Sequence, residues 1–326
     1  MLSKIKKPTY ICRFCGYGSD DIDNFEYDKI GFECPDCIGF TYFNNIEKEQ
    51  QHNFIMLLEN AKTTSFSTAT KPNFPTMVSP LRYPGGKSKI VGQILSHCNA
   101  RKMDTFVEPF AGGASVGLSL LLAGKIKHLY LNDLDFGIFS LFWLIKNQPN
   151  LLCDRIQNFV PSEDEYRHAQ ELILSPNKEL NMVEAGWNTL IVNRLAFSGI
   201  CKANCMSNPS ARWNPVTLCK RIRKISDVAE QIHLSNMDAC EFIEQMYWRI
   251  NTTILIDPPY YVKGKDLYNK YYVEKDHEQL AFLLDTLYQG MPGADMILTY
   301  DYCKNIIELY SNPLIKEISR KYSIAN

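Results

Sequence analysis

The chain of 326 residues is longer than most single domains, and 45% of its residues are apolar, so we expect one large domain with its own core and a smaller attached unit. A formal net charge of −1 excludes a chain that is basic throughout, so any contact with nucleic acid has to come from a local patch. No apolar stretch approaches the ~18 residues of a membrane span, and the first residues lack the apolar core of a signal peptide. We therefore expect a cytoplasmic protein with no membrane partner.

The N-terminal segment contains two CxxC pairs, in a chain whose eleven cysteines, an odd number, argue against a disulfide framework. Cys12 and Cys15 form the first pair, and Cys34 and Cys37 form the second. This spacing is typical of a zinc ribbon, in which four thiolates close a tetrahedral structural site; two redox or incidental pairs are the alternative. We expect a Zn²⁺ ribbon over residues 1–45 that touches DNA, a protein partner or only the main domain. We expect the other cysteines to be small buried or half-buried thiols: Cys98, Cys153, Cys201, Cys205, Cys219, Cys240 and Cys303.

The segment that follows is interpreted as a connection. Residues 46–60, IEKEQQHNFIMLLEN, predict a short helix, and the Thr-, Ser- and Pro-rich stretch up to residue 80 predicts a linker. These patterns place the short helix and linker over 46–80 and the main domain over 81–326.

The main domain begins with a polar turn and then a glycine turn. The stretch LRYPGGKSKI at 81–90 bends sharply, but it lacks the upstream glycine and the leading strand of a P-loop, so we do not expect nucleotide hydrolysis. Residues 105–118, TFVEPFAGGASVGL, predict a strand, a glycine turn and a helix. Such a turn lets a ligand approach a helix N-terminus, although many glycine turns merely connect elements, and this one does not match GxGxxG.

Several later strands end in acidic residues. The strand in HLYLNDLD at 128–135 ends at Asp133, and an acid about 20 residues past a glycine turn typically binds ribose hydroxyls, although Asp133 alone could equally cap the next helix. Together these features favour an adenosine-containing cofactor without a pyrophosphate, such as S-adenosylmethionine. Asp238 follows another short strand, and Asp257 follows the strand in ILIDPPYY at 254–261. Because ligands bind outside the carboxyl ends of strands, these acids and Glu108 can converge on one crevice.

A cationic segment lies between these motifs. Residues 194–224 contain seven basic residues and no Asp or Glu, with Phe197 and Trp213 interleaved. This composition indicates phosphate contacts combined with stacking groups, whereas a solvated basic helix over 216–225 is the plainer interpretation. The expected DNA contacts are Arg194, Lys202, Arg212, Trp213, Lys220, Arg221, Arg223 and Lys224.

Four motifs, RYPGGKSK, FVEPFAGGASVGL, LNDLD and DPPYY, resemble in sequence and in order the Dam family (D12 class) of DNA adenine methyltransferases, from about residue 80 to the end. The resemblance implies a doubly wound, Rossmann-like α/β fold with an inserted, mainly helical DNA-recognition segment at about 150–235. It implies transfer of a methyl group from S-adenosylmethionine to the N6 amino group of adenine in double-stranded DNA, by a monomer.

The same resemblance assigns roles to residues. Asp133 would hold the ribose hydroxyls of S-adenosylmethionine, and Asp238 would lie near the adenine ring of this cofactor. The full cofactor site would comprise Tyr83, Lys87, Glu108, Pro109, Phe110, Gly112, Gly113, Asp133, Asp238 and Asp257. The catalytic motif would be Asp257, Pro258, Pro259 and Tyr260.

The DPPY motif suits the chemistry of an aromatic amine, whose lone pair is delocalised into its ring. The Asp257 carboxylate and the Pro258 carbonyl can accept the two amino hydrogens and so localise that lone pair in the transition state. Tyr260 can stack on the base, which has to be flipped out of the duplex. Relatives acting on cytosine typically carry Ser, and those acting on protein glutamine carry Asn, where Asp257 stands. Asp257 therefore favours adenine over these other substrates.

Alternatives remain open at this point. The enzyme could methylate RNA or another amine, or the chain could be a catalytically impaired module that binds DNA or cofactor. The C-terminal KEISRKYSIAN resembles the family's penultimate strand, and we expect the further strand that completes the sheet in relatives to be missing here.

Overall fold

The computed structural model describes most of the chain from residue 53 to residue 319. The described ranges are 53–60, 74–75, 77–83, 85–98, 103–175, 180–261, 264 and 270–319, together with five short strands before residue 52. Two compact units are present, one formed by 1–52 with 288–292 and the other by 53–287 with 293–326. Each unit is described by itself.

The described residues of the smaller unit form two antiparallel sheets, one of two strands and one of three. The strands are β1 (Tyr10–Ile11) paired with β2 (Gly18–Ser19), and β3 (Glu26–Tyr27) paired with β4 (Gly31–Glu33), which also pairs with β5 (Phe40–Tyr42). The four cysteines expected to bind zinc lie outside the described residues, so the zinc ribbon stays a prediction.

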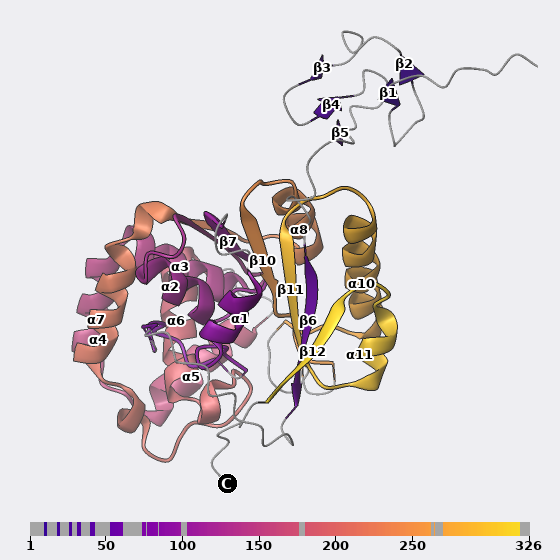
Figure 1. The fold of residues 1–326 in the computed structure, drawn as a ribbon. Helices are drawn as coiled ribbons and strands as arrows, with labels where there is room; N and C mark the ends of the chain where they lie inside the picture. Colours follow the sequence, from indigo (N-terminus) through magenta and orange to yellow (C-terminus); the bar gives the residue numbers. More distant parts are fainter. Residues whose placement is uncertain are drawn as a thin grey trace, which may run out of the picture. The chain divides into compact units, whose positions relative to one another are not determined.

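The larger unit is built on a seven-stranded sheet in the order β12-β6-β11-β10-β7-β8-β9 (Figure 1). Every pairing between neighbouring strands is parallel. The strands are β6 (Phe54–Asn60), β7 (Thr105–Glu108), β8 (His128–Asn132), β9 (Ile232–Ser235), β10 (Thr252–Ile256), β11 (Asp295–Asp301) and β12 (Leu314–Ser319).

Helices cover both faces of this sheet. The strands of a parallel sheet carry apolar side chains on both faces, so both faces have to be buried. All five residues of β10, TTILI, are buried. On one side lie α1 (Val91–His97), α2 (Ser115–Leu122) and α3 (Phe136–Asn147), and on the other α8 (Ala239–Tyr247), α10 (Glu274–Gln289) and α11 (Lys304–Leu309) (Figure 1). The arrangement confirms the predicted doubly wound α/β fold.

The predicted helical insertion is also present, as four helices outside the first layer. Helix α6 packs against α3 and α5, and α4 packs against α7. The four are α4 (Pro149–Asn158), α5 (Glu163–Leu174), α6 (Met182–Leu195) and α7 (Pro215–Ser226). None of the described helices is both long and apolar enough to cross a bilayer.

The helix predicted over 46–60 is wrong, because Phe54–Asn60 form strand β6 of the main sheet. Phe54 to Leu58 are buried where β6 lies between β11 and β12, and a continuous apolar run of this length fits a buried strand as well as a helix. The larger unit therefore begins before residue 81. Strand β12 pairs with β6 along its length, so a segment from the N-terminal side supplies a seventh strand to the sheet.

The order of connections fixes where a ligand can bind. From β7 the chain moves outward through β8 to β9, and from β10 it moves in the opposite direction to β11. Parallel sheets open a crevice at such a switch point, outside the carboxyl ends of the strands. The site is therefore expected next to the ends of β7 and β10.

Candidate active site

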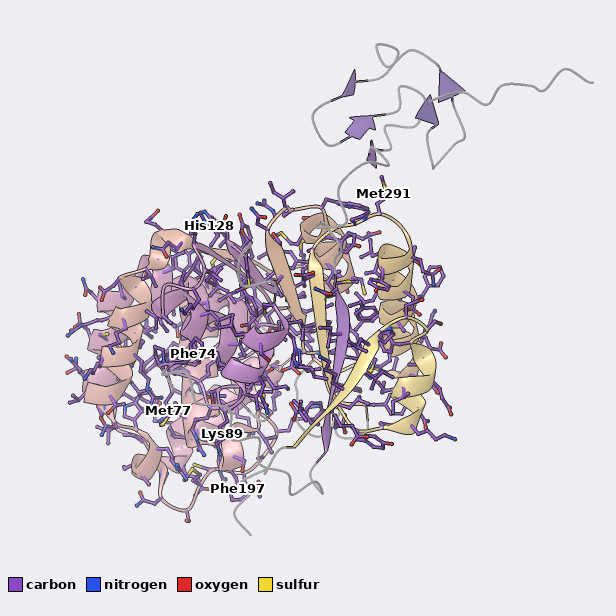
Figure 2. All side chains as sticks on the ribbon, viewed as in Figure 1. Phe74, Met77, Lys89, His128, Phe197 and Met291 are labelled. Atoms are coloured by element: carbon purple, nitrogen blue, oxygen red, sulfur yellow. The ribbon has the colours of Figure 1, made fainter. Side chains whose placement is uncertain are left out.

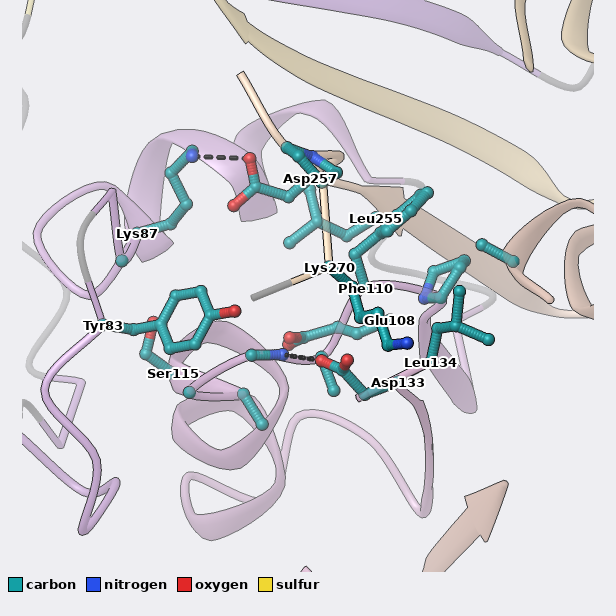
Figure 3. A pocket seen from close by; sticks show the side chains of 18 of the residues that line it. Tyr83, Lys87, Glu108, Phe110, Ser115, Asp133, Leu134, Leu255, Asp257 and Lys270 are labelled. Carbon is teal, nitrogen blue, oxygen red and sulfur yellow. Dashed lines mark hydrogen bonds and ion pairs between the residues drawn. The ribbon is translucent and has the colours of Figure 1, made fainter. Parts of the chain in front are cut away.

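A pocket opens at the carboxyl ends of β7, β8 and β10 (Figure 3). The empty space, counted with the open solvent at its mouth, is about 950 Å³. All ten residues predicted for the cofactor site line it. They are Tyr83, Lys87, Glu108, Pro109, Phe110, Gly112, Gly113, Asp133, Asp238 and Asp257.

The floor of the pocket is the glycine turn between β7 and α2. Gly112 has a positive φ of 46°, and a Cβ built on it would lie 2.7 Å from Cε1 of Tyr83. Glycine is therefore required here for two reasons, the backbone conformation and the close approach of the Tyr83 ring. The ring lies across the turn and faces the pocket (Figure 3).

Asp133 lines the pocket beyond the turn. The Oδ2 atom of Asp133 accepts a hydrogen bond from the Gly112 backbone N–H at 2.8 Å, and Oδ1 accepts one from Asp135 N–H at 2.9 Å. The helix cap of α3 is Asp135, which accepts from Gly137 N–H, so Asp133 is not needed as a cap. Burial raises the pKa of Asp133 to about 7.

Asp238 has a structural role as well as a place in the pocket. It is the N-cap residue of α8, and its Oδ1 accepts from Cys240 N–H at 2.8 Å and from Glu241 N–H at 3.3 Å. Such a cap stabilises the helix by about 1 kcal/mol. Its side chain is thereby held in a fixed position at the wall of the pocket.

Glu108 lies at the end of β7 and is buried. Its Oε1 accepts from Gly117 N–H at 2.5 Å, and a Cβ at position 117 would lie 2.8 Å from the same oxygen. Burial raises the pKa of Glu108 to about 8, and the charge of Asp257 acts in the same direction, while the Gly117 hydrogen bond and Lys87 oppose the shift. At neutral pH Glu108 is therefore mainly protonated.

Asp257 is held from two sides through one oxygen. Its Oδ1 accepts from Lys87 Nζ at 2.6 Å and from Thr299 Oγ1 at 2.6 Å. Its second oxygen faces the pocket (Figure 3). Two donors on one oxygen fix the orientation of the carboxylate and leave the other oxygen for a ligand.

The other residues of the DPPY motif directly follow Asp257, and their catalytic roles stay predictions. Pro259 lines the pocket beside Asp257, whereas Pro258 and Tyr260 are not among its lining residues. Tyr260 is only 5% exposed, and Lys87 Nζ lies 5.4 Å from the centre of its ring.

Some residues of the site were missed by sequence reasoning. Thr299 comes from β11, and nothing in MILTYD marks one threonine as a partner of Asp257. Glu59 comes from β6 and forms an ion pair with Lys87 at 3.1 Å, but its segment was interpreted as a helix. Other lining residues without a sequence signal are Ser115, Leu134, Leu255, Lys270, Tyr271 and Tyr272.

Two of the predicted DNA contacts are structural. Arg194 is 9% exposed and donates to the backbone carbonyls of Arg212 and Pro80, and burial lowers its pKa to about 10. Trp213 is 6% exposed, donates from Nε1 to the Ile156 carbonyl at 3.1 Å, and packs against Trp187. Both side chains are thus held inside the protein by partners that the sequence pattern does not reveal, and their contact with DNA stays a prediction.

The remaining basic residues are distributed over both ends of the insertion. Lys202 is exposed, and its Nζ lies 5.1 Å from the ring centre of Tyr271, which lines the pocket. Arg223 and Lys224 are exposed in the last turn of α7, which leads into the amino end of β9, so they lie away from the pocket. Of the others, Arg212 and Lys220 are exposed and Arg221 is half-buried.

Figure 2 shows which exposed side chains share the pocket end of the larger unit. Phe197 and Lys89 lie at this end, and His128, at the amino end of β8, lies at the opposite end. Phe197 is 54% exposed. An exposed aromatic ring and exposed cations therefore lie on the side where a substrate would enter.

Comparison with known proteins gives a family and two relatives. The sequence model described as "D12 class N6 adenine-specific DNA methyltransferase" matches residues 83–324. The chain is 22% identical over 271 residues to the "Type II methyltransferase M.MjaIII" of Methanocaldococcus jannaschii, covering 75% of this chain and 91% of that protein. It is 39% identical over 71 residues to the "Modification methylase StsI" of Streptococcus sanguinis, covering 22% of this chain and 10% of that protein.

Proposed function

The chain belongs to the D12 class of N6 adenine-specific DNA methyltransferases, and from this premise we propose that the pocket binds S-adenosylmethionine and presents it to one adenine flipped out of duplex DNA. The observation that carries the proposal is Asp257, whose carboxylate is fixed through Oδ1 and faces the pocket with its second oxygen. A carboxylate oxygen held in a fixed position can accept a hydrogen bond from the adenine amino group and so activate its nitrogen for methyl transfer.

The residues of the pocket fit S-adenosylmethionine. Asp133 supplies a carboxylate for the two ribose hydroxyls, as an acid does at this place in other doubly wound sheets. Gly112 adds no side chain of its own to the pocket floor, and the Tyr83 ring packs closely against it. The pocket holds no Gly-rich loop of the P-loop or GxGxxG type, which a pyrophosphate would require.

When bound, S-adenosylmethionine supplies a methyl group activated by its sulfonium. We propose that Asp257 and the Pro258 carbonyl accept the hydrogen bonds of the adenine N6 amino group, which localises the nitrogen lone pair toward the methyl carbon. Transfer would form the N–C bond while the S–C bond breaks with its electron pair on sulfur, and the proton that N6 loses would pass to the Asp257 carboxylate through their hydrogen bond. Lys87 and Thr299 keep Asp257 oriented, so that no reorganisation is needed as charge develops.

DNA would approach the pocket end of the larger unit. Lys202 beside Tyr271 and the exposed Lys89 supply phosphate contacts, and Phe197 supplies an apolar ring. A base inside a duplex is out of reach of Asp257, so the base has to leave the stack, and an exposed ring can fill the space left behind.

The test is transfer of labelled methyl from S-adenosylmethionine to unmethylated duplex DNA, followed by analysis of the released nucleosides. We expect the label in N6-methyladenine, and we expect an excess of duplex RNA of matched length not to compete. Label in cytosine, or label that RNA removes, would overturn the proposed substrate. Cofactor binding without any transfer would favour the alternative of a binding module.

We also propose that the smaller unit holds a structural Zn²⁺. In sequence, Cys12 and Cys15 fall between the paired strands β1 and β2, and Cys34 and Cys37 fall between the paired strands β4 and β5. Connections of this kind are where zinc ribbons carry their ligands. We expect one equivalent of zinc in the purified chain and its loss in the Cys12→Ser, Cys34→Ser double variant; full-length protein without bound metal would contradict the proposal.

A further inference from the structure

Glu59 is a buried carboxylate beside the reaction site that comes from outside the region matched by the family model. That region begins at residue 83, whereas Glu59 belongs to β6. It is 3% exposed, and its Oε1 lies 3.1 Å from Lys87 Nζ. The side chains of this ion pair are almost completely buried, at 0% for Glu59 and 2% for Lys87.

The ammonium group of Lys87 is shared between two carboxylates. Its Nζ lies 2.6 Å from Asp257 Oδ1 and 3.1 Å from Glu59 Oε1, and it also donates to the Gly85 carbonyl at 3.1 Å. A buried charge is retained only where it is paired and hydrogen-bonded, so removal of either carboxylate changes how strongly Lys87 interacts with the carboxylate that remains. Glu59 therefore influences how strongly Lys87 engages Asp257.

The sheet brings these groups together from three adjacent strands. Glu59 lies near the carboxyl end of β6, in register with Asp301 of β11 and Ile318 of β12. Thr299 lies on β11, and Asp257 directly follows β10. Glu59, Thr299 and Asp257 thus stand on neighbouring strands at the same edge of the sheet, with Lys87 reaching across them from the turn before α1.

We propose that Glu59 is a positioning residue for methyl transfer, which acts through Lys87 to set the orientation and charge of Asp257. With Glu59 present, the positive charge of Lys87 is divided, and Asp257 keeps enough negative charge to accept the N6 hydrogens. Without Glu59, Lys87 no longer shares its charge with a second carboxylate, so it pairs more strongly with Asp257 and weakens that acceptor. The inference rests on the proposed function and adds a residue to the same site.

The experiment measures single-turnover methyl transfer to duplex DNA at saturating S-adenosylmethionine, together with the cofactor Kd. We expect Glu59→Gln to slow transfer about tenfold or more while the Kd changes less than about threefold, because an interaction used in the transition state affects the rate rather than binding. Glu59→Asp, which keeps the charge but shortens the side chain, is expected to fall between Glu59→Gln and the native protein.

A matched control is Asp295→Asn, which also neutralises a buried carboxylate in this sheet. Asp295 is 9% exposed and accepts from Asn53 N–H at 2.7 Å at the amino end of β11, remote from the pocket. We expect it to lower thermal stability and to leave the transfer rate within about twofold of native. An equal loss of rate in both variants would show that Glu59 contributes only to stability and would overturn the inference.

A double-mutant cycle tests whether Glu59 acts through Lys87. In a Lys87→Met background, Glu59→Gln is expected to slow transfer no further, because the group through which it acts is gone. Fully additive losses would overturn the proposed route. If Glu59→Gln does not fold, Glu59→Asp decides, and a native rate in that variant contradicts the inference.

The same assay separates the inference from the proposed function. A native protein that methylates adenine, with Glu59→Gln equally fast, overturns the role of Glu59 alone. A native protein that binds S-adenosylmethionine but methylates no adenine overturns the proposed function, and the role of Glu59 with it.

Discussion

Replacement of Gly112 by alanine is expected to damage the cofactor pocket by moving Tyr83. The added Cβ would lie 2.7 Å from Cε1, 2.9 Å from Cζ and 3.0 Å from Cδ1 of the Tyr83 ring. Three contacts at or below 3.0 Å with one ring cannot be relieved by a small adjustment, so the ring has to leave its position. Because Tyr83 lines the pocket, we expect the Kd for S-adenosylmethionine to rise about tenfold or more, which corresponds to about 1.4 kcal/mol.

Gly124→Ala provides the matched control for backbone strain. Gly124 also has a positive φ, 64° against 46° at Gly112, but a Cβ built on it meets nothing within 4 Å. Alanine in this conformation costs about 1–2 kcal/mol at either position, and forced repacking of a ring adds about 1–3 kcal/mol at Gly112 only. We therefore expect Gly112→Ala to be less stable than Gly124→Ala by about 1–3 kcal/mol.

The assay is urea unfolding of both variants, combined with calorimetric titration of S-adenosylmethionine. A Tyr83→Ala background provides a further check, since removal of the ring should reduce the cost of Gly112→Ala to that of Gly124→Ala. Equal stability and equal cofactor affinity for the two glycine variants would refute the reasoning, because the ring contact would then have no energetic consequence.

Three further predictions follow from burial and charge. Glu108→Gln should be more stable than the native protein, by an amount that grows as pH rises from about 5 to 8 and then levels off. The reason is that Glu108 ionises at its ordinary pKa in the unfolded chain, whereas the folded state keeps it protonated up to about pH 8. Thermal melts across this pH range check the prediction, and a stability difference that does not change with pH would contradict it. Trp213→Ala should cost about 3–5 kcal/mol in chemical unfolding, whereas Trp248→Ala, which alters a side chain that is 45% exposed, should cost far less; similar losses would show that burial of Trp213 is not what stabilises the insertion. Lys202→Glu should weaken binding of duplex DNA of any sequence and reduce the salt dependence of the Kd. Lys224→Glu, which makes the same charge change away from the pocket, should have little effect. Equal weakening by both variants in filter binding would contradict the prediction that DNA binds at the pocket end.

The parts of the fold that were predictable from sequence carry strong local patterns. The strand, glycine turn and helix at 105–118 are present as β7, the turn at Gly112 and α2, because the glycine pair marks where the short apolar run ends and the longer helical stretch begins. The acids that follow β8 and β10 could be assigned to one crevice because parallel strands bring their carboxyl ends to one edge.

The parts that were not predictable depend on contacts between distant segments. FIMLLE in β6 is apolar along its whole length, so its pattern could not distinguish a buried strand from a helix, and its place between β11 and β12 is decided by the sheet. The hydrogen bonds of Asp257 with Thr299 and Lys87 were not predicted for the same reason, since these residues are 42 and 170 positions away in sequence. In the basic segment, Arg194 is held inside by carbonyl acceptors that no local pattern reveals.

The central claim is that Asp257 accepts the amino hydrogens of a flipped adenine, and Asp257→Asn tests it most directly. The change keeps the size of the side chain but removes its charge, which weakens acceptance of the N6 hydrogens in the transition state. In a single-turnover assay with labelled S-adenosylmethionine and duplex DNA, we expect the transfer rate to fall at least about a hundredfold, with the affinities for cofactor and DNA nearly unchanged. Transfer to adenine at the native rate in this variant would contradict the account.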